Sequence, residues 1–246
     1  MMSLLFFVVA VIYSMVGMGG GSSYIAILAL FDVPYLAIPF IARLCNLIVV
    51  TGNTYHFVRQ GHFSWKLSWP FIVSAIPMTF FGATIPISKQ LFLTLLGGTL
   101  FLLGVKLLII DRWYVDEKII NPINRKWAFG IGAVLGFLSG LTGVGGGIFL
   151  APVLHLLRWG TPKQIAASAS VFIFSGSLAG LAGQAITHWS PSNLTDYWIL
   201  FVVVLCGGQL GSFLGSSKFS QNAIRKCTGA VVLFAGMRLL MKVLSS

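Results

Sequence analysis

The segment "SMVGMGGGSSYIAILALF" runs from Ser14 to Phe31, and "SGLTGVGGGIFLAPVLHLL" runs from Ser139 to Leu157. Each carries the glycine pattern G-x-G-G-G in the middle of an apolar block, at residues 17–21 and 143–147. A glycine costs about 1 kcal/mol per helical position relative to alanine, so three in a row favour a locally unwound backbone. The sequence therefore predicts two apolar helical segments, each interrupted at its glycine cluster.

The composition is that of an integral membrane protein. Of the 246 residues, 57% are hydrophobic and only 9% are charged, whereas soluble domains are about 25% charged. The apolar blocks are long enough for helical spans, which need roughly 20 residues, and they lack the period-2 alternation of strands. We therefore expect an all-α polytopic membrane protein. The blocks cover approximately residues 2–31, 35–58, 67–83, 89–110, 127–158, 163–187, 195–216 and 221–244.

The chain repeats itself. The two glycine clusters are offset by 126 residues, Pro34 and Pro162 by 128, and "GVKLL" (104–108) and "GMRLL" (236–240) by 132. Because the order is kept and the offsets are close, the pattern predicts a duplication within one membrane domain. Its parts would be a first half at 1–110, a charged connecting loop at 111–126 and a second half at 127–246.

Blocks 2–31 and 127–158 are too long for one straight span. Thirty helical residues reach about 45 Å, against roughly 30 Å of hydrocarbon. If both blocks cross the membrane, the Lys and Arg residues of the loops and ends divide 8 against 6; if both fold back as re-entrant hairpins, they divide 11 against 3. Because cytoplasmic loops collect basic residues, the charges favour hairpins in a cell (inner) membrane protein, with the basic loops cytoplasmic and both termini outside.

Each half would then hold one broken hairpin and three transmembrane helices. An odd number of spans inverts the second half relative to the first. Inverted repeats with broken helices are typical of secondary transporters, which bind their substrate near the bilayer midplane. A duplicated helical scaffold without transport is the alternative.

The glycine clusters are candidate anion sites. A helix that restarts near Ser22 or Ile148 exposes free N–H groups and about half a positive charge, and bare glycine lets an anion approach the backbone. Close helix packing, common for small residues in membranes, is the competing interpretation. The candidate ligands are Gly19, Gly20, Gly21, Ser22 and Ser23 in the first half and Gly145, Gly146 and Gly147 in the second.

Arg43 lies eight residues into an apolar block. An arginine there costs about 2.5–3.5 kcal/mol on insertion scales, so we expect its side chain to face the protein interior. A guanidinium suits sulfite, sulfonate, carboxylate or phosphate oxygens; the alternative is snorkelling or pairing with the C-terminal carbonyls of a helix. Asn46 follows one turn later on the same face, and the equivalent block of the second half offers Ser168 and Ser170 but no arginine.

A looser polar stripe continues through Asn53 and His56, with Gln184 in the second half. These residues are candidates for a coupling or polar pathway, and His56 could carry a proton, although a lone histidine near a helix end is more often structural. No acidic residue lies in the middle of a block, which argues against a cation pump or a carboxylate-bound metal. We see no motif for a hydrolase or a nucleotide site, so we expect no catalytic residue, metal or cofactor.

Two halves that each open with an apolar G-x-G-G-G segment, here "VGMGGGSSYIAIL" and "TGVGGGIFLAPVL", resemble the TauE/SafE family of membrane transporters over nearly the whole chain. The resemblance implies export of sulfite, sulfoacetate or related organosulfonates. It also implies that residues 19–23 and 145–147 are the functional loops. The first copy departs from the family with "SSYIAIL", where a proline-containing run is usual.

The sequence therefore predicts a secondary transporter, an exporter, for a small sulfur-containing anion held between the two glycine breaks, with alternating access by rocking of the halves. The alternatives are an anion channel and a non-transporting structural membrane protein. The expected partners are the anion and the lipid bilayer, with a second copy of the chain as a further candidate. The net charge of +11 is assigned to cytoplasmic loops, not to nucleic-acid binding.

Overall fold

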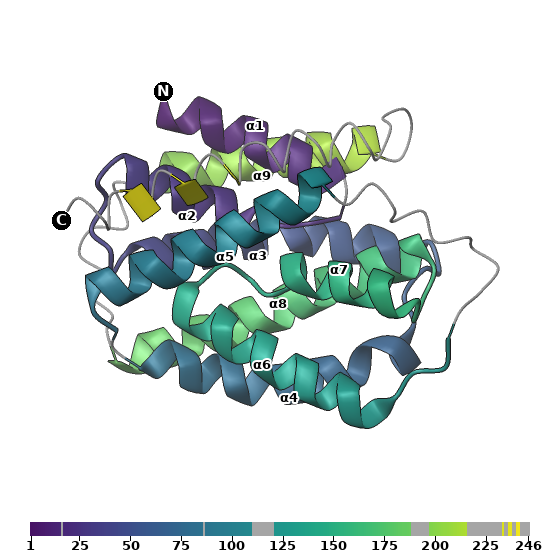
Figure 1. Cartoon of the computed structure of the whole chain (residues 1–246). Helices are drawn as coiled ribbons and strands as arrows, with labels where there is room; N and C mark the ends of the chain where they lie inside the picture. The colour runs from purple at the N-terminus through teal and green to yellow at the C-terminus, as the bar shows by residue number, and fades with distance from the viewer. Residues whose placement is uncertain are drawn as a thin grey trace.

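The computed structural model describes residues 1–15, 17–85, 87–109, 121–187 and 197–215, together with residues 233, 236, 237, 240 and 241. The described chain is helical, as the sequence predicts (Figure 1). Its helices are α1 (Met2–Met15), α2 (Gly21–Leu30), α3 (Ile38–Arg59), α4 (Trp65–Thr84), α5 (Lys89–Ile109), α6 (Arg125–Thr142), α7 (Gly147–Leu157), α8 (Pro162–Thr187) and α9 (Trp198–Gly215).

Both glycine clusters interrupt the helix, as predicted. The first separates α1 from α2, and the second separates α6 from α7. Gly20 has a φ of 84° and Gly145 a φ of 75°, a left-handed conformation that residues with a Cβ adopt only at a cost. The chain can therefore turn between the paired helices only where glycine supplies this freedom.

The two restarted helices begin with the same hydrogen bonds. The N–H groups of Ser23 and Tyr24 both donate to the carbonyl of Gly20 at 3.0 Å. In the second half, the N–H groups of Phe149 and Leu150 both donate to the carbonyl of Gly146 at 3.0 Å. Donors and acceptors are offset by 126 residues, the same offset as the glycine clusters.

α1 and α2 fold back on each other. The rings of Phe6 and Tyr24 stack with their centroids 4.8 Å apart, although Phe6 lies far before the break. The hydroxyl groups of Tyr13 and Ser23 are 2.9 Å apart. Residues on both sides of the break can meet in this way only if the two helices run in opposite directions.

α6 and α7 form a second antiparallel pair. Just before α6 begins, the backbone N–H of Asn121 donates to the carbonyl of Arg158 at 2.8 Å, and its side-chain amide donates to the carbonyl of Leu157 at 3.0 Å. The start of α6 therefore lies beside the end of α7. Figure 1 shows α2 running back toward the end of the molecule where α1 begins, and α7 toward the end where α6 begins.

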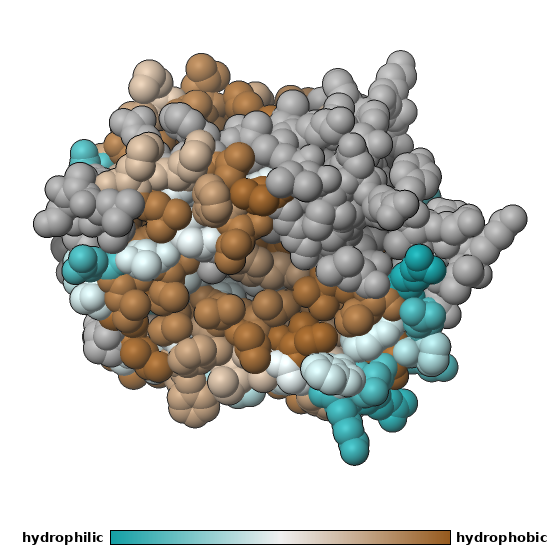
Figure 2. Space-filling view, viewed as in Figure 1, coloured by the Kyte–Doolittle hydropathy of each residue, from teal (hydrophilic) through white to brown (hydrophobic). Residues whose placement is uncertain are grey.

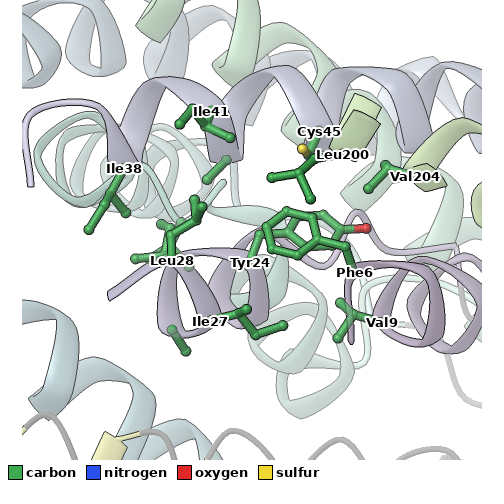
Figure 3. Close-up of a cluster of buried hydrophobic side chains, with 14 of the residues drawn as sticks. Phe6, Val9, Tyr24, Ile27, Leu28, Ile38, Ile41, Cys45, Leu200 and Val204 are labelled. Atoms are coloured by element: carbon green, nitrogen blue, oxygen red, sulfur yellow. The ribbon is translucent and has the colours of Figure 1, made fainter. Parts of the chain in front are cut away.

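Each antiparallel pair packs on one of two hydrophobic cores, and Val144 and Ile148 of the second pair also reach the first core. The first core lies among α1, α2, α3 and α9 and includes Phe6, Tyr24, Leu28, Ile41 and Val204 (Figure 3). The second lies among α4, α6, α7 and α8 and includes Leu67, Phe71, Leu150, Leu154 and Phe172. Because both short helices are buried on these cores, the backbone at each break is held in place by packing.

Glycine also sets the closest helix contacts. A Cβ on Gly136 of α6 would lie 2.7 Å from the Cα of Ala75 of α4, and one on Gly140 would lie 2.5 Å from the carbonyl oxygen of Thr79. α9 approaches α1 in the same way at Gly207. At these positions the small-residue packing typical of membrane helices accounts for the glycine.

The outer surface is apolar. Figure 2 shows hydrophobic residues across the middle of one face, with hydrophilic residues toward its ends. Trp65, Trp127 and Trp198, which lie at the starts of α4, α6 and α9, are 60%, 68% and 59% exposed, and tryptophan is enriched at membrane–water interfaces. Within the described chain, Trp65–Thr84 and Lys163–Thr187 are long and apolar enough to cross a membrane, and shorter apolar helices accompany them.

Candidate functional site

The two glycine breaks meet at a cavity in the interior of the protein. Its empty volume is about 180 Å³, a figure that includes space open to solvent. The enclosed part holds about one water molecule in this conformation. The cavity is lined by Tyr13, Met18, Gly19, Gly20, Gly21, Ser22, Asn46, Val144, Gly145, Ile148 and Ile173.

Asn46 of α3 contacts both breaks. Its side chain is 1% exposed, and its Nδ2 donates a long hydrogen bond of 3.5 Å to the carbonyl of Val144. A Cβ on Gly19 or Gly21 would overlap the Asn46 amide, and one on Gly145 would lie 2.7 Å from Nδ2. The glycines therefore leave room for a polar side chain that reaches both halves of the sequence.

Two polar atoms at the cavity have no hydrogen-bond partner among the described residues. They are Asn46 Oδ1 and Ser22 Oγ, and each belongs to a residue that is 1% exposed. An unsatisfied buried polar group costs about 1–3 kcal/mol, and nearly all such groups in native proteins have a partner. A small polar species in the cavity, a water molecule included, would complete their hydrogen bonds.

The electrostatic character of the cavity comes from the backbone. α2 begins at Gly21 and α7 at Gly147, and residues at both starts line the cavity. The first N–H groups of a helix have no partner in a preceding turn, and each helix start carries about half a positive charge. No charged side chain is among the lining residues. This arrangement favours an anion.

Arg43 lies close to the cavity but is not among its lining residues. It is 1% exposed, and its Nη2 donates to the carbonyl of Ser139 at 3.1 Å and to that of Gly140. Both carbonyls belong to the last turn of α6, so Arg43 has the helix C-terminal pairing that was the alternative to anion binding. Its Nη1 has no partner among the described residues, and a contact with substrate stays a prediction.

Ser23 and Ser170, both predicted ligands, lie behind the cavity wall. The Ser23 hydroxyl is paired with Tyr13 at 2.9 Å. Ser170 donates to the carbonyl of Gly17 and to that of Ala166. In this conformation both side chains support the lining without belonging to it.

The remaining predicted ligands also lie outside the lining. Ser68 of α4 donates to the Ser168 hydroxyl at 2.8 Å. A Cβ on Gly146 would lie 2.7 Å from Phe172, and one on Gly147 would overlap Ile173. Of the twelve predicted ligands, the lining includes Gly19, Gly20, Gly21, Ser22, Asn46 and Gly145.

The residues of the candidate polar pathway do not meet at the cavity. Asn53 accepts a hydrogen bond from Ser14 at 2.9 Å and donates to the carbonyl of Met18 at 3.3 Å, so it supports the first break. His56 is exposed near the end of α3. Gln184 lines a separate pocket beside Pro39 and Gly140, and its Oε1 has no partner among the described residues. A role in coupling stays a prediction.

Five lining residues were not predicted from the sequence. Met18 and Val144 are the variable positions of the two G-x-G-G-G patterns, and Ile148 follows the second pattern directly. Ile173 lies 127 residues after Asn46, but the aligned pairs are offset by 126, 128 and 132, so the repeat does not single it out. Tyr13 carries no comparable signal in the sequence.

Comparison with known proteins identifies the family. The chain matches the family described as "Sulfite exporter TauE/SafE" over residues 2–239. It belongs to the TauE/SafE family. The resemblance of the two glycine segments is thereby confirmed, and the chain is a multi-pass membrane protein of a transporter family and not an enzyme.

Relatives of this TauE/SafE chain occur in bacteria and archaea. It is 32% identical over 243 residues to "Probable membrane transporter protein y4hK" of Sinorhizobium fredii, with 97% of each chain covered. It is 23% identical to "Probable membrane transporter protein YunE" of Bacillus subtilis, with 92% of each covered. It is 27% identical to "Probable membrane transporter protein MJ0441" of Methanocaldococcus jannaschii, over 71% of this chain and 68% of that one. No solved structure matches.

Proposed function

We propose that this protein is a secondary transporter that exports a small sulfur-containing anion, such as sulfite or an organosulfonate. The anion would bind in the cavity between the two glycine breaks. The observation that carries this proposal is the convergence of two helix N-termini on a cavity whose wall holds two unpartnered polar atoms and no charged side chain. The sulfur chemistry rests on the family, whose description names sulfite.

Each part of the site has a role in this proposal. The first N–H groups of α2, from Gly21 and Ser22, and of α7, from Gly147 and Ile148, would donate to the anion oxygens. The Ser22 hydroxyl would add a further donor. Backbone donors leave no fixed full charge in the cavity, so the anion would bind without being trapped there. A carrier must bind its substrate weakly enough to release it on the other side of the membrane.

The arrangement supports an inverted repeat made of halves 1–110 and 127–246. A Cβ on Gly17, at the tip of the α1–α2 pair, would lie 2.9 Å from Cζ of Phe57 near the end of α3, and one on Gly143, at the tip of the α6–α7 pair, would lie 2.7 Å from Pro39 at its start. The two pairs thus reach past Asn46 from opposite ends of α3. We propose that they are re-entrant hairpins and that rocking of the halves alternates access to the cavity.

The basic residues support an orientation. Six of the basic residues in the described part of the chain lie at helix ends on the same side of the molecule as the start of α6. On this side Asn121 contacts Arg158. By the positive-inside rule, we propose that this end, on the right in Figure 1, is cytoplasmic and that the N-terminus is outside. The connecting loop and the C-terminus lie largely outside the described residues. The six are Arg59, Lys66, Arg125, Lys126, Arg158 and Lys163.

Counterflow in proteoliposomes tests the proposal. Vesicles loaded with unlabelled sulfite and diluted into a trace of radiolabelled sulfite should accumulate the label transiently above its equilibrium level, because a carrier exchanges one bound anion for another. Saturable flux without this overshoot would contradict exchange of anions through one alternating site. Flux that never saturates would instead indicate an anion channel. No flux of sulfite or any organosulfonate above that of protein-free vesicles would contradict transport and favour a structural role.

A further inference from the structure

We infer that the cavity accepts its substrate as a monoanion that carries one hydroxyl group, such as hydrogensulfite, in preference to a dianion or to an anion without a hydroxyl. This inference rests on the proposed transport of a small sulfur-containing anion. It specifies the ionic form of the substrate that binds. It follows from two independent features of the cavity: the positive charge of its helix starts, and a side-chain atom that can only accept a hydrogen bond and has no donor.

The positive charge at the cavity matches one negative charge. Each helix start contributes about half an elementary charge, and the starts of α2 and α7 line the same space at Gly21 and Ile148. The guanidinium of Arg43 is already bound to the carbonyls of Ser139 and Gly140 and does not line the cavity. A monoanion would therefore be neutralised, whereas a dianion would leave one charge uncompensated in a buried site.

The side-chain oxygen of Asn46, Oδ1, needs a hydrogen-bond donor. Oδ1 can only accept a hydrogen bond, and it has no partner among the described residues. The orientation of the amide is set by the carbonyl of Val144, which accepts from Nδ2; a flipped amide would bring two acceptors together there. An anion oxygen facing Oδ1 would be repelled, and a hydroxyl facing it would be bound.

The two helix starts would accommodate the deprotonated oxygens. The free N–H groups at the starts of α2 and α7 can only donate, and the Ser22 hydroxyl, unpartnered at the cavity, can donate as well. Ile173, which also lines the cavity, is apolar. The site therefore combines donors for charged oxygens with the Asn46 acceptor for one hydroxyl.

Two sulfonates that differ by one hydroxyl group test this inference. Hydroxymethanesulfonate and methanesulfonate both carry one negative charge at neutral pH, and sulfate carries two. Thermal stabilisation of the purified protein in detergent should give an apparent Kd about tenfold lower for hydroxymethanesulfonate than for methanesulfonate, because only the former satisfies Asn46 Oδ1. Sulfate should bind more weakly than either. The affinity for sulfite should fall as the pH rises and hydrogensulfite loses its proton, while the affinity for methanesulfonate stays constant.

Asn46→Leu removes the acceptor while keeping a similar side-chain volume. In this variant the two sulfonates should bind equally, because the acceptor that distinguishes them is gone. Thr79→Val is the matched control, since Thr79 is equally buried but donates to the carbonyl of Gly136, at 2.9 Å, away from the cavity. It should keep the tenfold preference.

The outcomes separate the two proposals. Equal binding of the two sulfonates to the wild-type protein, or strongest binding of sulfate, would overturn the preferred ionic form and leave the anion carrier intact. If neither sulfonate, nor sulfite, nor sulfate stabilises a well-folded sample, the proposed function itself fails, and the ionic form with it. The wild-type comparison decides the matter even if Asn46→Leu does not fold.

Discussion

Replacing Asn46 by aspartate is expected to lower the affinity for a small anion by about a thousandfold. The substitution keeps the side-chain shape but places a carboxylate at the cavity wall, between the two helix starts. Two like charges about 4 Å apart repel by about 4 kcal/mol at an effective dielectric constant of about 20, and about 1.4 kcal/mol corresponds to a factor of ten. The new carboxylate would also take the positive charge of the helix starts for itself. Equilibrium binding of radiolabelled sulfite to the purified variant measures the loss.

The variant Asn46→Leu separates the effect of the added negative charge from the effect of losing the amide. It is similar in size and uncharged, so it should lose the preference for a hydroxylated anion without the thousandfold loss of affinity expected from the carboxylate. If Asn46→Asp binds sulfite within tenfold of the wild-type affinity while folded, the anion does not lie beside Asn46. The cavity between the breaks would then not be the substrate site.

Gly21→Ala is expected both to destabilise the protein by about 1–3 kcal/mol, the usual cost of overpacking a filled interior, and to abolish anion binding. A Cβ at this position would lie 2.6 Å from the carbonyl oxygen of Val144 and would overlap the amide of Asn46. The backbone oxygen cannot move away without shifting the second break. Thermal denaturation in detergent, with and without sulfite, reports both effects.

Gly130→Ala in α6 is the matched control. A Cβ there would have no atom within 4 Å, and the helical conformation of α6 suits alanine. The gain in helix propensity is up to about 1 kcal/mol, so this variant should be as stable as the wild type or slightly more so, with unchanged anion binding. Equal behaviour of Gly21→Ala and Gly130→Ala would mean that close contact between the two breaks is not required.

The helix breaks were predictable because their cause is local. Three consecutive glycines weaken a helix whatever surrounds them, and the restarts expected near Ser22 and Ile148 occur one residue earlier, at Gly21 and Gly147. That each segment folds back on itself was predictable only from the distribution of Lys and Arg among all the loops, because this distribution depends on the whole chain. The packing of Phe6 on Tyr24 that accompanies it has no signature in the sequence.

The site was only partly predictable because its residues meet through packing between the halves. Helical spacing placed Asn46 on the interior face of α3, but not its contact with Val144, which lies 98 residues away. The partners of Arg43 likewise come from the other half, at Ser139 and Gly140. A buried arginine indicates that some acceptor faces it, and the sequence does not distinguish a carbonyl from an anion.

The sequence also treated Ser168 and Ser170 as equivalents of the polar residues in the first half. Neither serine lines the cavity, and the lining residue from α8 is Ile173, which is apolar. The two breaks therefore share their backbone hydrogen bonds but face different side chains.

Locating a bound anion directly would test the central claim, that the substrate binds between the two glycine breaks. Selenite is the heavier homologue of sulfite, and anomalous diffraction from crystals grown with it would mark the position of the selenium atom. We predict a single peak in the cavity, within hydrogen-bond reach of Asn46, Ser22 and the first N–H groups of α2 and α7. A peak in the pocket lined by Gly140 and Gln184, with none between the breaks, would contradict the account.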